Sequence, residues 1–125
     1  MATILLSIKP EYVERIFNGV KKYEFRKHLP QEKVDKIVVY STNPVQQIVG
    51  EAEVLGLLKM KPSPLWESTK NAAGISRAKY RAYFMGCSTA YAFQLGEVRK
   101  YEVPKTLAEM GIKSAPQSFV YLNAD

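Results

Sequence analysis

The sequence predicts an α+β fold, a small open β-barrel or curled sheet of five to six mostly antiparallel strands with flanking helices. Short apolar segments rich in β-branched and aromatic residues recur along the chain, and they are too numerous and too widely spaced for a helix bundle. Only one strand–helix–strand unit occurs, so a doubly wound parallel sheet is not expected. The 125 residues, 46% of them hydrophobic, predict a single domain over residues 1–125 that folds without a disulfide or a structural metal.

The N-terminal unit begins with residues 3–8, an apolar run typical of a buried strand. Pro10 suits the first turn of a helix, and an apolar stripe continues from Tyr12 to Phe17. Gly19 follows as a left-handed cap, which ends the helix.

The segment from Lys22 to Arg26 alternates with period two, as a strand with two different faces does. Tyr23 and Phe25 are predicted on one face, with Glu24 and Arg26 on the other. Lys21 lies in the turn just before this strand.

Further strands are predicted at residues 36–41, 48–58, 89–95, 98–103 and 118–122. A helix is predicted from Arg77 to Met85, with Ser76 as its N-cap and Gly86 closing it. Thr106 and Glu109 form a capping-box pattern over a short turn that ends at Gly111. Residues 61–67 contain two prolines and Trp66, and we interpret them as a loop that either covers a cleft or packs on the barrel.

Charge is unevenly distributed along the chain. Lysine and arginine total 18 against 12 acidic residues, a net charge of +6, and residues 59–105 hold nine basic and three acidic side chains. This excess favours either a polyanionic partner or a merely soluble basic surface.

Composition also excludes several classes of site. The single Cys87 and the single His28 supply neither an intramolecular disulfide nor a tetrahedral zinc set, so no metal and no cofactor are predicted. No stretch approaches the roughly 20 apolar residues of a membrane span, and no signal-peptide core is recognisable. We expect a cytoplasmic protein without a membrane partner.

The first candidate site is the segment Gly19-Val20-Lys21-Lys22-Tyr23-Glu24-Phe25-Arg26. Glu24 could orient Lys21 or Arg26 toward a ligand while accepting an amino group of a base itself. The alternative is a salt bridge on a solvated strand, which contributes little.

Ser7-Ile8-Lys9-Pro10 before an amphipathic helix, followed by Gly19-x-Lys21-x-x-Glu24-x-Arg26, resembles the ASCH domain family of the PUA-like superfamily. The resemblance covers essentially the whole chain, including Pro116-Gln117-Ser118-Phe119. It implies a PUA-like β-barrel whose cleft, lined by the motif lysine, acid and arginine, holds RNA or a nucleobase.

Some bacterial proteins similar to this family are amidohydrolases on N4-acetylcytidine, with a motif lysine, a threonine and a separate glutamate. Here Glu24 stands at the threonine position, and Gly74-Ile75-Ser76-Arg77, where the separate acid would be sought, has no carboxylate. Lys21 could act as nucleophile or base only if its pKa were lowered, and Glu24 is expected to raise that pKa. Glu24 could instead activate a water, with Lys21 or Arg26 stabilising the oxyanion.

The second candidate site is the helix Arg77-Ala78-Lys79-Tyr80-Arg81-Ala82-Tyr83-Phe84, which carries three cations and three aromatic residues without an acid. Arg77 and Arg81 lie one turn apart on one face and could contact successive phosphates, or they could simply be solvated. The three aromatic residues could stack on bases, but core packing is the competing interpretation.

Other residues give weaker signals. His28 is expected to be an exposed loop residue and Cys87 a small buried side chain rather than a nucleophile. Gln117 and Ser118, at the start of the last strand, are placed either to bind a base edge or to cap the strand end.

Three functions remain open. The first is an RNA- or nucleobase-binding module in RNA metabolism or translation-linked regulation, the second a small amidohydrolase on modified nucleosides, and the third a protein-interaction or regulatory domain. No DNA-reading element is recognisable. The catalytic candidates, if the protein is an enzyme, are Lys21, Glu24 and Arg26. The candidates for ligand binding are Lys9, Lys21, Glu24, Arg26, Arg77, Lys79, Arg81, Gln117 and Ser118.

Overall fold

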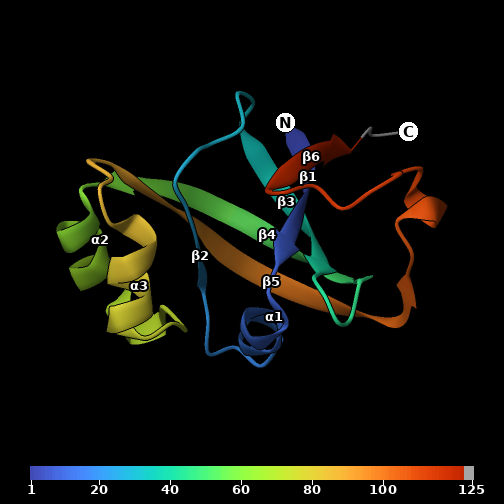
Figure 1. The fold of residues 1–125 in the computed structure, drawn as a ribbon, viewed down its shortest axis with the longest axis horizontal. Helices are drawn as coiled ribbons and strands as arrows, with labels where there is room; N and C mark the ends of the chain where they lie inside the picture. The colour runs from blue at the N-terminus through green and yellow to red at the C-terminus, as the bar shows by residue number, and fades with distance from the viewer. Residues whose placement is uncertain (123–125) are drawn as a thin grey trace.

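The computed structural model describes residues 1–122, whose helices and strands are arranged as Figure 1 shows. The strands are β1 (Ala2–Ile8), β2 (Tyr23–Arg26), β3 (Val34–Ser41), β4 (Gln47–Met60), β5 (Ala90–Lys105) and β6 (Phe119–Leu122). The helices are α1 (Pro10–Phe17), α2 (Pro62–Thr69) and α3 (Arg77–Phe84), with short 3₁₀ turns η1 (Lys70–Ala72) and η2 (Ala108–Met110).

The six strands form one mixed sheet in the order β2-β5-β4-β3-β1-β6 over the described residues. β1 pairs in parallel with β3, and the other pairings are antiparallel. Because β2 and β6 lie at the two edges, the sheet curls without closing. The predicted α+β class, with mostly antiparallel strands and flanking helices, is confirmed.

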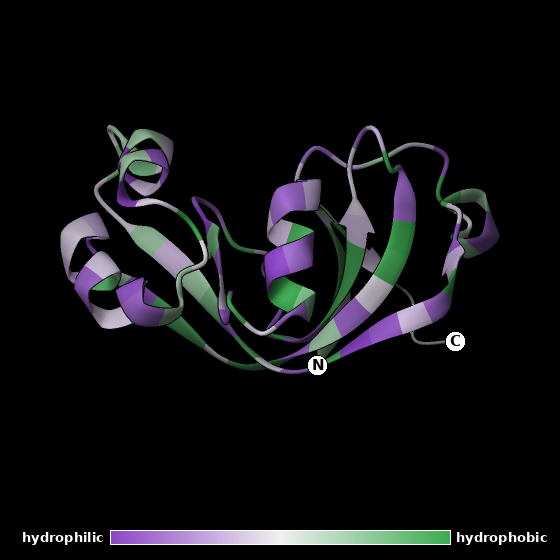
Figure 2. Ribbon diagram, turned by 90° about the horizontal axis from the view of Figure 1, so that it is seen from below, coloured by the Kyte–Doolittle hydropathy of each residue, from purple (hydrophilic) through white to green (hydrophobic). Residues whose placement is uncertain are grey.

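Helix α1 lies in the concavity of the sheet, with its hydrophobic side toward the strands, as Figure 2 shows. Val13 and Ile16 bury that side against Ile4 and Leu6 of β1. Leu5, between these two residues of β1, points to the opposite face and packs with residues of the C-terminal segment. β1 is therefore covered on both faces, as its continuous apolar sequence predicts.

Two of the predicted strands are one in the structure. β5 continues through Gly96 and Glu97, where the sequence suggested a break between residues 95 and 98. β4 runs beside it, and the pairing shifts register between Ala52 and Gly56 to accommodate the irregularity. Local sequence signals a break here, but the long partner strand keeps the backbone extended.

The segment interpreted as a loop is helix α2, so that interpretation was wrong. Pro62 occupies the first turn, where its fixed φ suits a helix and its missing N–H costs nothing. Leu65 is fully buried, and the ring centroid of Trp66 lies 4.9 Å from that of Tyr80 in α3. The two helices thus have their own apolar cluster at one end of the long β4–β5 ribbon, apart from α1 (Figure 2).

The predicted caps are confirmed. The Ser76 side chain accepts a hydrogen bond from the Lys79 amide at 3.1 Å. Thr106 and Glu109 exchange hydrogen bonds between side chain and backbone, as a capping box requires. Within residues 1–122, no helix is long and apolar enough to span a membrane.

Candidate ligand-binding cleft

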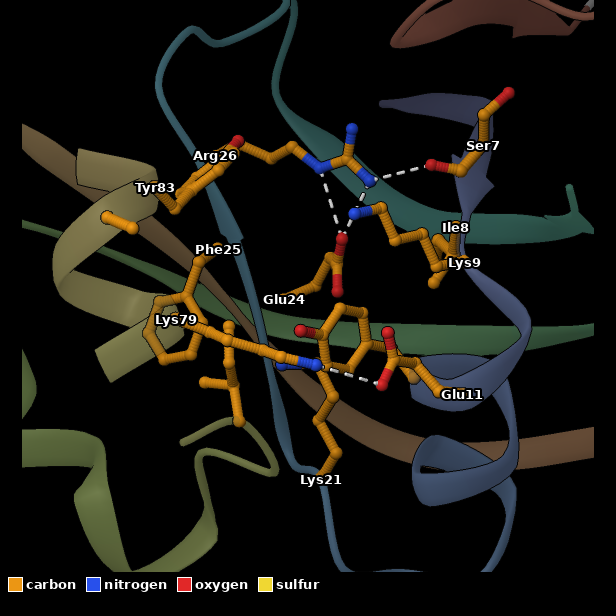
Figure 3. A pocket seen from close by; sticks show the side chains of 13 residues that line it. Ser7, Ile8, Lys9, Glu11, Lys21, Glu24, Phe25, Arg26, Lys79 and Tyr83 are labelled. Carbon is orange, nitrogen blue, oxygen red and sulfur yellow. Dashed lines mark hydrogen bonds and ion pairs between the residues drawn. The ribbon is translucent and has the colours of Figure 1, made fainter. Parts of the chain in front are cut away.

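A cleft of about 540 Å³ opens between α1, β2 and α3 (Figure 3). Its walls come from the end of β1, the first turn of α1, the strand β2 and one side of α3. The lining residues are Ser7, Ile8, Lys9, Glu11, Tyr12, Lys21, Glu24, Phe25, Arg26, Ile75, Lys79, Ala82 and Tyr83. Lys21, Glu24, Phe25 and Arg26 of the motif segment therefore line a cavity.

Glu24 and Arg26 form an ion pair in one wall of the cleft. Arg26 donates to Oε2 of Glu24 from Nε at 3.1 Å and from Nη2 at 2.7 Å. Nη2 also donates to the backbone carbonyl of Ser7 at 2.9 Å, and Nη1 reaches Oγ of Ser118 at 3.4 Å. Both side chains of the pair are largely buried, so this is not the solvated surface bridge of the alternative interpretation.

Ser118 and Gln117 differ in their relation to this site. Ser118, the residue before β6, contacts Arg26, and its carbonyl accepts a hydrogen bond from the Ser7 amide, so it supports the ion pair. Gln117 is exposed and does not line the cleft. Of the two, only Ser118 is close enough to affect a ligand there, and it does so through Arg26.

Lys21 is a buried cation, with only 3% of its surface exposed. Its Nζ donates to the carbonyl of Ala73 at 2.8 Å and lies over the rings of Tyr12 and Phe25, 5.2 and 4.8 Å from their centroids. Two π faces and one carbonyl stabilise the ammonium, in place of the water it has lost.

Burial lowers the pKa of the Lys21 ammonium below its ordinary value of 10.5. The Glu24 carboxylate raises that pKa, but Arg15 and Arg26 lower it further, and the balance is a decrease. Glu24 does raise the pKa of Lys21, as the sequence led us to expect, but the effect of burial is larger. The sequence alone does not show how deeply the amine is buried.

The backbone around Gly74 makes the burial of Lys21 possible. Gly74 has a φ of +63°, and a Cβ at this position would collide with the side chain and backbone of Lys21. The Gly74 carbonyl accepts a hydrogen bond from Nη1 of Arg15 at 3.0 Å. The loop before α3 is therefore fastened to α1 and covers Lys21 closely.

Glu11 and Tyr12 are site residues that the sequence analysis missed. Glu11, in the first turn of α1, forms an ion pair with Lys79 of α3 at 3.4 Å between Oε2 and Nζ, and the pair connects the two sides of the cleft (Figure 3). Glu11 is thus a second carboxylate in the cleft, supplied by α1 and not by residues 74–77. Its only sequence signal is its place directly after the Ser7–Pro10 motif.

Helix α3 directs its polar side chains to two different places. Lys79, Ala82 and Tyr83 line the cleft, and Lys9 faces them from the other wall. Arg77 and Arg81 line a separate hollow against α2. The three aromatic residues also divide: Tyr80 and Phe84 are core residues, as the competing interpretation held, whereas Tyr83 is 36% exposed at the cleft.

The remaining candidates lie outside the cleft. His28 is exposed in the turn after β2, and Cys87 is half-buried beside the α2–α3 cluster. Within residues 1–122, no three histidine, cysteine or acidic residues gather in an arrangement that could hold a metal ion.

The ASCH domain family matches residues 6–105, which include the cleft motif and all three helices. The chain belongs to the ASCH domain family. This confirms the resemblance drawn from the Ser7–Pro10 and Gly19–Arg26 segments.

The ASCH domain also matches individual proteins over nearly its whole length. It is similar to the crystal structure of ASCH from Zymomonas mobilis, with a TM-score of 0.90 and 28% identity, over 98% of this chain and 89% of that one. It is 28% identical to an ASCH domain-containing ribonuclease of Zymomonas mobilis, over 97% of this chain and 84% of that protein. It is 35% identical to the ATP synthase subunit alpha of Ureaplasma parvum, but spans only 15% of that protein's length.

Proposed function

We propose that this ASCH domain binds single-stranded RNA by holding one nucleobase in the cleft. The observation that carries the proposal is the way Glu24 is held. Arg26 occupies Oε2 with two hydrogen bonds, and within residues 1–122 no group donates to Oε1. A carboxylate that is anchored through one oxygen and has the other oxygen free is suited to accept a hydrogen bond from an amino group of a base.

The walls of the cleft supply the other contacts that a nucleotide needs. Lys9 and Lys79 lie at opposite sides of the opening, where each ammonium could bind a phosphate. Tyr83 is 36% exposed at the same opening, where the Lys27 ammonium lies over its ring, 4.7 Å from the centroid. Lys79 already pairs with Glu11, so a phosphate there would replace a carboxylate. The relative named as a ribonuclease, which aligns with nearly all of this chain, supports RNA as the ligand class.

The test is binding of the four ribonucleoside monophosphates to wild-type protein and to Glu24→Gln. The glutamine keeps the size of the side chain but removes its charge. We expect the bases that carry an amino group to bind about tenfold more weakly to the variant, because a charge-assisted hydrogen bond is lost. Glu102→Gln is the matched control, since Glu102 is exposed on β5 and does not line the cleft. Equal affinity of wild type and Glu24→Gln for every nucleotide would contradict the proposal.

A hydrolytic reaction in the same cleft is a second candidate, and the lowered pKa of Lys21 favours it. A lower pKa increases the fraction of neutral amine, which is the form that can accept a proton from an attacking hydroxyl or water. The substrates to test are labelled RNA, because of the ribonuclease relative, and a panel of modified nucleosides that includes N4-acetylcytidine. Turnover by wild type that is lost in Lys21→Ala and in Lys21→Arg would establish an enzyme. Binding without turnover would leave the domain as a reader of RNA.

A protein-interaction role predicts a different result. The domain would then be captured with proteins after nuclease treatment, and no nucleotide would bind in the cleft. Both outcomes together would exclude the RNA-binding proposal.

A further inference from the structure

The two helices at the end of the β4–β5 ribbon enclose a second hollow, on the side of α3 that faces away from the cleft. Its volume is about 410 Å³. The lining residues are Pro62, Ser63, Pro64, Trp66, Glu67, Arg77, Tyr80 and Arg81. We call this hollow the α2–α3 groove.

Arg77 and Arg81 are the cations of the groove. They lie one helical turn apart on α3, so their guanidinium groups point to the same side. Among residues 1–122, neither guanidinium forms a hydrogen bond or an ion pair. The single acid of the groove, Glu67, instead pairs with Lys70 at 2.8 Å. The groove therefore presents two guanidinium groups without an ion-pair partner among the described residues, although Glu67 also lies within electrostatic range of Arg77.

Trp66 gives the groove an aromatic wall. Its ring packs at a tilt on Tyr80, but the residue is only half-buried, so part of the indole remains accessible. A planar aromatic surface beside guanidinium groups is the combination that binds nucleotides, because the ring stacks on a base while the guanidinium groups bind phosphates.

The position of α3 connects the two sites. Lys79 and Tyr83 line the cleft from one side of this helix, and Arg77 and Arg81 line the groove from the other. A helix with its side chains is about 10–12 Å wide, so a strand that leaves the cleft reaches the groove after crossing one helix. α3 itself carries three cations and no acid, so nothing on it repels a phosphate backbone.

We propose that the α2–α3 groove binds the nucleotides that flank the base held in the cleft, with phosphates on Arg77 and Arg81 and a base on Trp66. This inference rests on the proposed function, because it extends the same RNA strand from one site to the next. It assigns the domain a ligand of several nucleotides rather than a single nucleoside.

Trp66 allows the groove to be observed directly, because it is the chain's only tryptophan. We would titrate the protein with single-stranded oligonucleotides from one to six nucleotides long and follow the fluorescence of Trp66 and the dissociation constant. A mononucleotide should bind in the cleft with little change in fluorescence. Beyond a threshold length, the affinity should rise at least tenfold and the fluorescence should be quenched by the stacked base.

The variant Arg77→Gln/Arg81→Gln separates this inference from the proposed function. We expect it to lose the gain in affinity with length and the quenching, while its affinity for the mononucleotide stays unchanged. Lys100→Gln/Lys113→Gln removes the same charge from exposed positions elsewhere and should keep both.

Two other results would count against the inference. If the length-dependent gain and the quenching persist in Arg77→Gln/Arg81→Gln, the groove does not bind the strand. If oligonucleotides of every length leave the Trp66 fluorescence unchanged while the mononucleotide binds in a Glu24-dependent way, the cleft binds RNA and the groove does not. Failure of the mononucleotide to bind at all would instead overturn the proposed function.

Discussion

Lys21 has an unusual environment for a lysine. Its ammonium lies under the loop that contains Gly74 and is held by one carbonyl and two aromatic rings. The sequence motif identified this residue, because a lysine, an acid and an arginine stand close together after a helix. It could not reveal the burial, because Ala73 and Gly74 are about fifty residues away along the chain.

The lowered pKa of Lys21 predicts how stability changes with pH. Between the folded-state pKa and the ordinary value of 10.5, the unfolded chain binds a proton that the folded protein does not. The free energy of unfolding should therefore rise with pH across this interval, because the cost of burying the charge disappears. Tyr80, whose pKa burial raises to about 12, contributes with the opposite sign above pH 10.

Comparison with Lys21→Met isolates the contribution of Lys21. Both proteins are unfolded with urea at a series of pH values from neutral to about pH 10.5. The free energy of unfolding of wild type should increase relative to that of Lys21→Met as the pH rises. A difference that is constant over this range would mean that Lys21 keeps its ordinary pKa.

For the Glu24–Arg26 pair, we expect the loss of one partner to destabilise the fold more than its share of the loss of both. Arg26→Met leaves the Glu24 carboxylate largely buried without its cation, so we expect the free energy of unfolding to fall by about 3 kcal/mol. The double variant Glu24→Leu/Arg26→Met should be destabilised by less than the sum of the two single variants. A double-mutant cycle by urea denaturation measures the difference, and additive effects would show that the two side chains do not interact.

At the scale of elements, the sequence predicted best where local chemistry decides the structure. α1, α3 and the turn at Thr106–Gly111 have the caps and the periodicity that such elements need. The errors came where tertiary contacts decide. α2 forms around two prolines because Leu65 and Trp66 pack on α3 and the sheet, and β5 stays continuous because β4 runs beside it.

The contribution of the α3 N-cap to stability can be tested by mutation of Ser76. Ser76→Ala removes the hydrogen bond to the Lys79 amide and should lower the free energy of unfolding by about 1 kcal/mol. Ser76→Asp can accept the same hydrogen bond and is the matched variant, so it should retain most of the stability. Denaturation curves for the three proteins decide this, and equal loss in both variants would exclude a role for the cap.

The cleft is a property of the whole molecule. Its lining comes from β1, α1, β2, the loop before α3 and α3 itself. From the sequence, Lys21, Glu24 and Arg26 could be grouped because they are neighbours. Glu11, Tyr12 and Tyr83 could not be assigned to the same cavity, because only the packing of α1 and α3 around β2 brings them there. The same packing separates Lys79 from Arg77 and Arg81, which the sequence placed together.

The net charge of +6 predicts that RNA binding weakens with salt. Each phosphate contact with single-stranded nucleic acid contributes about 0.7 to the slope of log affinity against log salt. Loss of Arg77 and Arg81 should therefore reduce the slope for a hexanucleotide by about 1.4, measured by fluorescence anisotropy over a series of salt concentrations. Lys100→Gln/Lys113→Gln should leave the slope unchanged, and an equal reduction in both double variants would indicate a diffuse effect of net charge.

Met60 and Ala90 lie opposite each other in the antiparallel pairing of β4 with β5. The whole segment 61–89, with α2 and α3, thus leaves and re-enters the sheet at adjacent points, as the turn of a hairpin does. We expect that another segment could replace it without a change in strand order, provided that the new segment still covers Phe25 and Ala92 and supplies the carbonyl contacts to Lys21 and Arg15. The wall of the cleft that α3 forms therefore belongs to one insertion between β4 and β5, whereas the wall formed by β1, α1 and β2 lies outside that insertion. If the cleft binds RNA as we propose, exchange of residues 61–89 alone is expected to change which bases it prefers.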